Sequence, residues 1–258
     1  PTSLSFMTQS CDLLISGGGI AGLAAAAAFG SAGFSVICVD PAPPVTDRDT
    51  DGADMRTTAM LQPARDLLQA AGVWDALAPH GAALDVMQIV DAGGSDGTAR
   101  TAKAFRASDV SDLPFGWNFQ NWRLRQVLVA RLGALDSVDF RPGVGAETLL
   151  TRTAEARVGL SDGSRIRTRL VIAADGRNSP MRSAAGIGVQ TRRYGQKALA
   201  FAVTHPTPHD NISTEVHQTG GPFTLVPLPD HQGQPCSAVV WMDDGPKSLA
   251  RHRADIPA

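Results

Sequence analysis

Three glycines near the start of the chain have the spacing of a phosphate-binding loop. Gly17, Gly19 and Gly22 satisfy the pattern G-x-G-x-x-G. In this pattern the first glycine permits a tight turn, the second lets the backbone approach a pyrophosphate, and the third lets a helix pack closely on a strand. Asp40 follows Gly22 by 18 residues, where a carboxylate accepts hydrogen bonds from ribose hydroxyls and disfavours a 2′-phosphate. These residues predict a site for an ADP-containing dinucleotide, and both NAD and FAD fit the pattern.

Such a loop requires a strand before it and a helix after it, and the sequence predicts both. Residues 11–16 form a short apolar run that ends at glycine, which is typical of a buried parallel strand. Residues 22–29 favour a helix, and the β-branched, apolar run over residues 34–40 predicts a second strand. The result is a β-α-β unit that presents a helix N-terminus to the phosphates. Without a ligand, the same glycines would serve only the turn and the packing.

A second group of chemistry-bearing residues follows another predicted strand, residues 170–174. Asp175 and Gly176 come directly after this strand, and Pro180 stands in the first turn of a predicted helix, where proline is tolerated. Arg182 completes the arrangement D-G-x-x-S-x-x-R. By itself, this arrangement also fits a helix start at which Asp175 and the serine act as local caps.

Together the two motifs resemble a known family. The D-G-x-x-S-x-x-R arrangement resembles the second fingerprint of the class A FAD-dependent aromatic monooxygenases, the para-hydroxybenzoate hydroxylase-like superfamily. Residues 54–61, 72–74 and 121–125 are similar to segments of the ubiquinone-biosynthesis hydroxylase family within it. The resemblance covers nearly the whole chain. It implies that the dinucleotide is FAD and that NADH or NADPH is the co-substrate.

The resemblance also implies which residues bind cofactors. It places Asp175, Gly176 and Arg182 near the FAD pyrophosphate and the path of the nicotinamide cofactor. It makes Arg56 and Arg125 candidates to contact the flavin or its phosphates. From the residues alone, Arg56 and Arg125 fit surface positions equally well, and Arg182 fits a salt bridge within its helix. The complete predicted cofactor-binding set is Gly17, Gly19, Gly22, Asp40, Arg56, Arg125, Asp175, Gly176 and Arg182.

The pattern along the chain predicts an α/β fold in which a Rossmann-like FAD-binding domain is interleaved with a β-rich substrate domain. Helical spacing occurs over residues 58–71 and 123–132, and the pattern becomes β-like after about Arg193. The predicted strands in that last part cover residues 198–203, 213–217, 223–226 and 238–241. The predicted domain ranges are 1–80 and 114–192 for FAD binding, and 81–113 and 193–258 for the substrate domain, which is incomplete.

The chain departs from the family pattern in one respect. Family members carry a third fingerprint, a G-D pair near the start of a later helix, whose aspartate holds the ribityl chain of the flavin. No such pair followed by a predicted helix occurs here, and Asp243-Asp244-Gly245 has the reverse order. We therefore expect the C-terminal part of the FAD domain to be missing, which leaves flavin retention and catalysis by this chain open.

The resemblance implies a reaction in two halves. NAD(P)H reduces FAD by hydride transfer, and the reduced flavin uses O2 to place one oxygen atom on an activated, phenol-like ring. The implied substrate is a small hydrophobic aromatic molecule, a prenylated phenol of ubiquinone biosynthesis. Two alternatives stay open: another flavin oxidoreductase of the same fold, such as a reductase or halogenase, and a dinucleotide-binding module without catalysis. No catalytic acid or base is identified. The apolar residues that suit either a substrate wall or an ordinary core are Phe201, Phe223, Leu225, Val226 and Leu228.

Composition narrows the partners and the compartment. The 258 residues carry a formal net charge of -2, which gives no electrostatic reason to expect a nucleic-acid partner. No apolar run approaches the roughly 20 residues of a membrane helix, and the start of the sequence lacks the basic residues of a secretory signal. Three lone cysteines suit a reduced, cytoplasmic protein, and a lipid-like substrate suits contact with the membrane periphery or with a biosynthetic complex. The histidines lack metal-ligand spacing, so no metal site is predicted.

Overall fold

The computed structural model describes residues 8–93, 98–218 and 220–253, without the side chains of Thr8 and Arg251. The described chain forms two compact units, each interrupted in sequence. The first unit contains residues up to 53, 66–78 and 122–190, and the second contains residues 54–65, 79–121 and those from 191 onward.

The first unit is built on a six-stranded sheet with the order β8-β2-β1-β11-β10-β9. Four of its strands run parallel, namely β8 (Val138–Pro142), β2 (Val36–Asp40), β1 (Thr8–Ser16) and β11 (Arg165–Ala173). The antiparallel strands β10 (Ala156–Leu160) and β9 (Ala146–Thr151) extend the sheet beyond β11. The predicted β-α-β unit is thereby confirmed, with both of its strands in the middle of the sheet.

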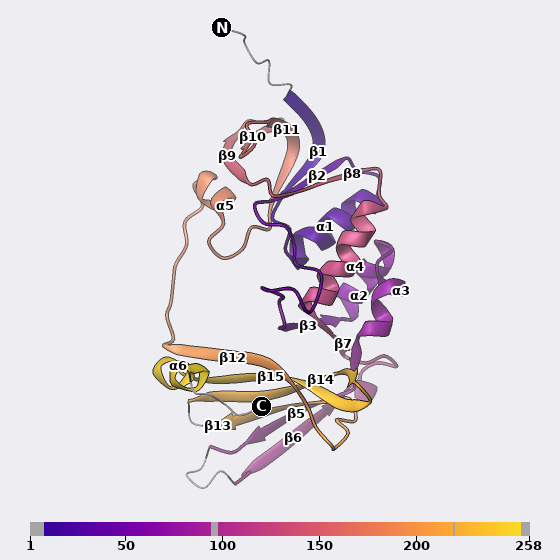
Figure 1. Cartoon of the computed structure of the whole chain (residues 1–258), viewed down its shortest axis with the longest axis vertical. Coiled ribbons are helices and arrows are strands. Elements are labelled where there is room, and N and C mark those ends of the chain that lie inside the picture. Colours follow the sequence, from indigo (N-terminus) through magenta and orange to yellow (C-terminus); the bar gives the residue numbers. More distant parts are fainter. Residues whose placement is uncertain (1–7, 94–97, 219, 254–258) are drawn as a thin grey trace. The chain divides into compact units, whose positions relative to one another are not determined.

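Helices cover this sheet and lead the chain between its strands. The helix α1 (Ile20–Ser31) packs against β1, β2 and β8, and Figure 1 shows it beside these strands. The other helices in or entering this unit are α2 (Gln62–Ala70), α3 (Trp74–Leu77), α4 (Asn121–Gly133) and α5 (Pro180–Ala184).

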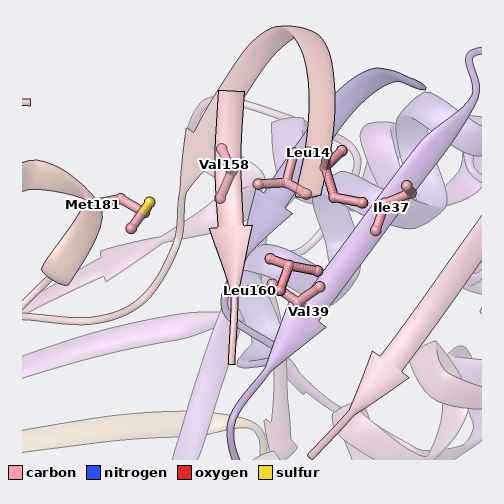
Figure 2. Close-up of a cluster of buried hydrophobic side chains, with 7 residues drawn as sticks. Leu14, Ile37, Val39, Val158, Leu160 and Met181 are labelled. Atoms are coloured by element: carbon pink, nitrogen blue, oxygen red, sulfur yellow. The ribbon is translucent and has the colours of Figure 1, made fainter. Parts of the chain in front are cut away.

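The core of the first unit joins the two motifs identified in the sequence. Side chains from the four strands β1, β2, β10 and β11 and from α5 form one buried cluster, shown in Figure 2. Its members are Leu14, Ile37, Val39, Val158, Leu160, Ile166 and Met181. Burial of each such side chain contributes about 1.5–3 kcal/mol, so the packing holds the end of β1 beside the end of β11.

The second unit contains a six-stranded sheet with the order β12-β15-β14-β13-β5-β6. Its strands are β5 (Val86–Asp91), β6 (Thr101–Arg106), β12 (Gln196–Thr204), β13 (Ile212–Gln218), β14 (Gly221–His231) and β15 (Gln234–Asp244). Neighbouring strands in this sheet pair antiparallel, except for β13 and β5, which pair parallel. A helix α6 (Gly245–Arg253) packs against β12 and β15. Short 3-10 turns occupy Ala78–His80 and Ala107–Asp109.

A three-stranded sheet in the second unit corrects one secondary-structure prediction. The predicted helix over residues 58–71 begins only at Gln62, because β3 (Thr57–Leu61) pairs antiparallel with β7 (Gly116–Gln120). The strand β4 (Ala82–Leu84) pairs with the other edge of β7. Helical spacing in residues 58–61 was therefore overridden by pairing with a strand far along the chain.

The same sheet shifts the boundaries between the compact units. Residues 54–65 and 114–121 were assigned to the FAD-binding domain from the sequence, yet they belong to the second unit. The reason is that β7 hydrogen-bonds to β3 on one edge and to β4 on the other. The functional assignment of the two units stays a prediction.

Candidate functional site

Two of the motif glycines are required by the protein itself. Gly17 follows β1 with φ +117°, and a Cβ there would lie 2.2 Å from the Ala174 carbonyl oxygen. A Cβ on Gly22 would lie 1.8 Å from the carbonyl oxygen of Gly17. Neither distance is tolerable for a carbon atom, so both positions need glycine for close backbone packing. The loop therefore closes directly against the start of the second motif.

Gly19 differs from the other two motif glycines. It is the N-cap residue of α1, with φ −74° and ψ 176°, a conformation that other residues adopt readily. A Cβ on Gly19 would meet nothing within 4 Å. Within the described chain its glycine identity therefore has no steric cause. The open space next to the first N–H groups of α1 fits a pyrophosphate, which a Cβ would obstruct.

Asp40 is held beside this loop by two backbone hydrogen bonds. The N–H of Gly18 donates to its Oδ2 at 2.5 Å, and the N–H of Ala42 donates to its Oδ1 at 2.8 Å. A Cβ on Gly18 would lie 2.8 Å from the Cβ of Asp40. The structure thus adds Gly18 to the site as the residue that lets Asp40 approach. The only sequence signal for it was the uninterrupted run of three glycines.

Asp175 connects the second motif to the first. Its Oδ2 accepts hydrogen bonds from the backbone N–H of Met181 at 3.1 Å and from the Ser16 hydroxyl at 3.4 Å. Its Oδ1 is buried and has no hydrogen-bond partner among the described residues. A buried acceptor without a partner costs about 1–3 kcal/mol. A donor from a bound molecule would remove that cost, so the site fits a ligand that carries a hydrogen-bond donor.

The residues after Asp175 form a capped helix start. Gly176 has φ +83°, which favours glycine, and the Ser179 hydroxyl accepts a hydrogen bond from the N–H of Arg182 at 3.0 Å. The Arg182 guanidinium donates to the carbonyl of Arg177 at 3.0 Å and so closes the loop on itself. The motif therefore forms the capped helix start that the residues alone predicted. It also remains compatible with cofactor binding, because Asp175 keeps one acceptor free.

The two remaining predicted residues, Arg125 and Arg56, lie in different units. Arg125 is half-buried on α4 in the first unit, with the glycine loop, Asp40 and Asp175. Arg56 lies in the second unit and is largely exposed. The guanidinium of Arg56 forms a bidentate ion pair with Asp54, with Nε–Oδ1 and Nη2–Oδ2 distances of 2.8 Å.

Removing this ion pair should have a pH-dependent effect on stability. Hydrogen bonds from Arg56 lower the pKa of the Asp54 carboxyl from 3.8 to about 2. Because the folded-state pKa is depressed, the pair stabilises the fold above pH 4, and this contribution is lost as the pH falls toward 2. Asp54→Asn should lower the free energy of unfolding by about 1 kcal/mol at pH 7, a value reduced for the exposure of Arg56.

Urea unfolding at pH 7 and at pH 2.5 measures this effect. The exposed Asp112 offers a control, because Asp112→Asn removes a carboxylate without an ion pair and should leave stability nearly unchanged at both pH values. If Asp54→Asn lowered the free energy of unfolding as much at pH 2.5 as at pH 7, the role assigned to the charge would be wrong.

The apolar residues singled out in the second unit divide between two faces of one sheet. Phe223 pairs with Trp241, and Leu225 pairs with Val239, which in turn pairs with Phe201. These residues share one face. Because side chains alternate along a strand, the remaining two residues lie on the opposite face. Val226 and Leu228 pack there with Cys236 and Ala238 in a small core cluster.

Phe201, Phe223 and Leu225 therefore share the other face of the sheet with Trp241 and the buried Val239. The rings of Phe223 and Trp241 meet edge to face with centroids 5.7 Å apart, and Phe201 is 40% exposed. Val226 and Leu228 belong to the ordinary core, as the alternative interpretation had it.

Other reactive groups in the described ranges give no further centre. Burial raises the pKa of the Cys38 thiol to about 12 and also raises the pKa of Cys11, so both thiols are protonated and unreactive at neutral pH. Within the same ranges no three His, Cys, Asp or Glu residues are grouped to hold a metal ion. None of the helices in the described chain is long and apolar enough to cross a membrane.

Comparison with known families identifies the cofactor. The family model described as FAD binding domain matches residues 10–255. The chain belongs to this family. The open space at Gly19 and the free acceptor of Asp175 fit FAD, and the role of the glycine loop toward this cofactor stays a prediction.

Curated relatives of this FAD-binding domain include ubiquinone hydroxylases. The ubiquinone hydroxylase UbiL of Rhodospirillum rubrum is 33% identical over 232 residues, which are 90% of this chain and 52% of the relative. The 3-demethoxyubiquinol 3-hydroxylase of Escherichia coli is 28% identical over 240 residues, or 91% of this chain and 58% of the relative. The chain thus spans little more than half the length of these relatives.

Solved structures confirm the fold class. PqsL of Pseudomonas aeruginosa, in complex with 2-aminobenzoylacetate, has a TM-score of 0.74 at 21% identity, with 95% of this chain and 63% of that chain covered. The p-nitrophenol 4-monooxygenase PnpA of Pseudomonas putida has a TM-score of 0.74 at 18% identity, with coverages of 95% and 62%. The predicted α/β fold is therefore confirmed, and the resemblance stated from the sequence is confirmed by the family match and the curated relatives.

Proposed function

We propose that this protein serves the FAD-dependent, NAD(P)H-driven hydroxylation of an aromatic ring, with a prenylated phenol of ubiquinone biosynthesis as substrate. The observation that carries the proposal is the junction of the two motifs, in which Asp175 is fixed by Ser16 beside the glycine loop and keeps one acceptor free. The names of the relatives support the reaction class and the substrate.

Each residue of the junction has a proposed role toward the cofactor. The N–H groups that begin α1 hold the pyrophosphate, which approaches over Gly19. Asp40, oriented by two backbone N–H groups, accepts a hydrogen bond from the adenosine ribose. Arg125 and Arg56 remain proposed contacts of the flavin or its phosphates, and Arg182 and Gly176 line the approach of the nicotinamide cofactor. When bound, FAD supplies the hydride acceptor and the activation of O2.

The second unit supports a hydrophobic substrate. Its sheet presents Phe201, Phe223, Leu225 and Trp241 on one face, and such aromatic side chains suit contact with a ring or a prenyl chain. In the proposed reaction this face excludes water from the ring. Exclusion of water limits side reactions of the reduced cofactor with solvent.

The FAD assignment should be visible directly. We expect the purified chain to show a flavin absorption spectrum after incubation with FAD and desalting, because the pyrophosphate, ribose and second-motif contacts all lie in one compact unit. Bovine serum albumin treated in the same way should stay colourless. A chain that takes up no FAD would contradict the binding roles proposed for these residues.

The reaction is tested in the organism that encodes the protein. Deletion of the gene should cause a prenylated phenol lacking one hydroxyl group to accumulate. Cells in which the gene is restored, grown under 18O2, should incorporate one labelled oxygen atom into the quinone ring. If the deletion strain still made quinone with all of its ring oxygens, the proposed substrate would be refuted. Halide-dependent or ene-reduced products would instead favour another flavin oxidoreductase, and FAD binding with no product would favour a binding module.

A further inference from the structure

One face of the sheet in the first unit carries arginines on neighbouring strands. Arg157 of β10 lies directly opposite Arg167 of β11, and Gly159 lies opposite Arg165. The alternate residues of these strands, including Val158 and Ile166, are buried in the core. The three arginines therefore project from the outer face, where like charges opposite one another destabilise a sheet.

The centre of this face is hollow. Gly159 has no side chain, and its strand neighbours on either side are Thr148 and Arg165. A cavity of about 690 Å³ opens here, and its walls include Thr148, Leu150, Arg157, Gly159, Arg165 and Arg167. We call this group the arginine hollow. Figure 1 shows β9, β10 and β11 side by side as strongly twisted strands.

Glycine at this position is itself informative. A glycine inside a strand weakens the strand and marks a bulge or the close approach of another group. The pairing of β9 with β10 shifts register between Gly159 and Leu160. The Thr148 hydroxyl accepts a hydrogen bond from the Gly159 N–H at 3.2 Å, and a Cβ on Gly159 would lie 2.4 Å from that hydroxyl oxygen. The hollow is thus built into the sheet.

The charge of the arginine hollow is only partly compensated. Glu155 pairs with Arg157 at 2.8 Å and with Arg167 at 3.9 Å, so one carboxylate holds two guanidinium groups in place. Arg165 forms no ion pair among the described residues. The cavity is therefore lined by three guanidinium groups, of which two share one carboxylate, and this excess of positive charge favours an anion with several acceptor oxygens.

We propose that the arginine hollow is a second anion site, distinct from the glycine loop, that binds a small phosphorylated molecule. The planar guanidinium forks match the geometry of phosphate oxygens, and Thr148 adds a hydroxyl. A flat arginine face would suit a lipid surface, whereas a concave hollow of about 690 Å³ has room to admit a soluble diphosphate-sized group.

Inorganic pyrophosphate is the probe for this site. Isothermal titration of the FAD-loaded chain, in which the cofactor occupies the glycine loop, should show saturable binding of one pyrophosphate. Arg165→Gln and Arg157→Gln should each weaken the binding at least about tenfold, as expected for the loss of one charge-assisted contact. Arg169→Gln is the matched control, since Arg169 continues the same strand outside the cavity and pairs with Asp12.

Three outcomes would overturn the proposal. The first is no pyrophosphate binding to a chain whose circular dichroism and urea midpoint match a folded protein. The second is an equal loss of binding in Arg169→Gln, which would indicate diffuse charge. The third is binding to phosphatidylglycerol vesicles, and not to phosphatidylcholine vesicles, without any binding of pyrophosphate. None of these results depends on whether the chain takes part in hydroxylation.

Discussion

Replacing Gly19 by valine should abolish FAD binding while leaving the fold intact. The valine side chain would occupy the space beside the first N–H groups of α1, where a Cβ meets no protein atom within 4 Å. The backbone at Gly19 is extended and accepts any residue. We expect FAD affinity to fall at least about 100-fold, which corresponds to roughly 3 kcal/mol of binding free energy. The quenching of flavin fluorescence measures the affinity, and urea unfolding without FAD measures the fold.

Gly133→Val is the matched control for this substitution. Gly133 ends α4, and a Cβ there also meets nothing within 4 Å. This variant should bind FAD as tightly as the unaltered chain. Its stability should fall only by the small cost of a β-branched residue at a helix end. If Gly19→Val bound FAD as tightly as the unaltered chain, the glycine-loop assignment would be wrong.

Replacing Gly22 by alanine should instead destabilise the protein before any cofactor is added. The new Cβ would lie 1.8 Å from the carbonyl oxygen of Gly17 and 3.3 Å from the Ala174 side chain. α1 would have to move away from β1 and β11, which disrupts the packing around Leu23 and Ala26. We expect the free energy of unfolding to fall by about 3 kcal/mol, the upper range for an overpacked core. The urea midpoint of the chain without FAD reports this loss.

Ala21→Ser controls for adding one heavy atom to the same turn of α1. Ala21 is exposed, so its variant should change stability by no more than about 0.5 kcal/mol. If Gly22→Ala and Ala21→Ser were equally stable, the packing between α1 and the loop would have room for an added Cβ at residue 22. The contrast between Gly19 and Gly22 therefore separates ligand contact from backbone packing within a single motif.

Patterns confined to neighbouring residues predicted the structure well. The strand before the glycine loop, the helix after it and the strand ending at Asp40 were all expected from apolar runs and glycine stops. The second motif likewise begins a helix at Pro180 with Ser179 as its cap. These features depend on local backbone geometry, and the residues that impose that geometry are adjacent in the sequence.

Features that depend on distant partners were missed. Residues 58–61 have helical spacing but belong to β3, because β7 supplies backbone partners from a segment more than 50 residues later. Gly18 was an unassigned position of the motif until the contact with Asp40 gave it a role. Only the strand register showed that Phe223 and Val226 lie on opposite faces of the sheet.

The sequence by itself determined the FAD-binding β-α-β unit, the second motif and the family, because glycine, proline and apolar periodicity act over a few residues. Only the tertiary structure decided which glycines the protein needs for its own packing and which leave room for a ligand. It alone placed the free acceptor of Asp175 beside the loop and three arginines around Gly159. Those arrangements arise from the pairing of β1, β10 and β11, whose residues are far apart in sequence and adjacent only after folding.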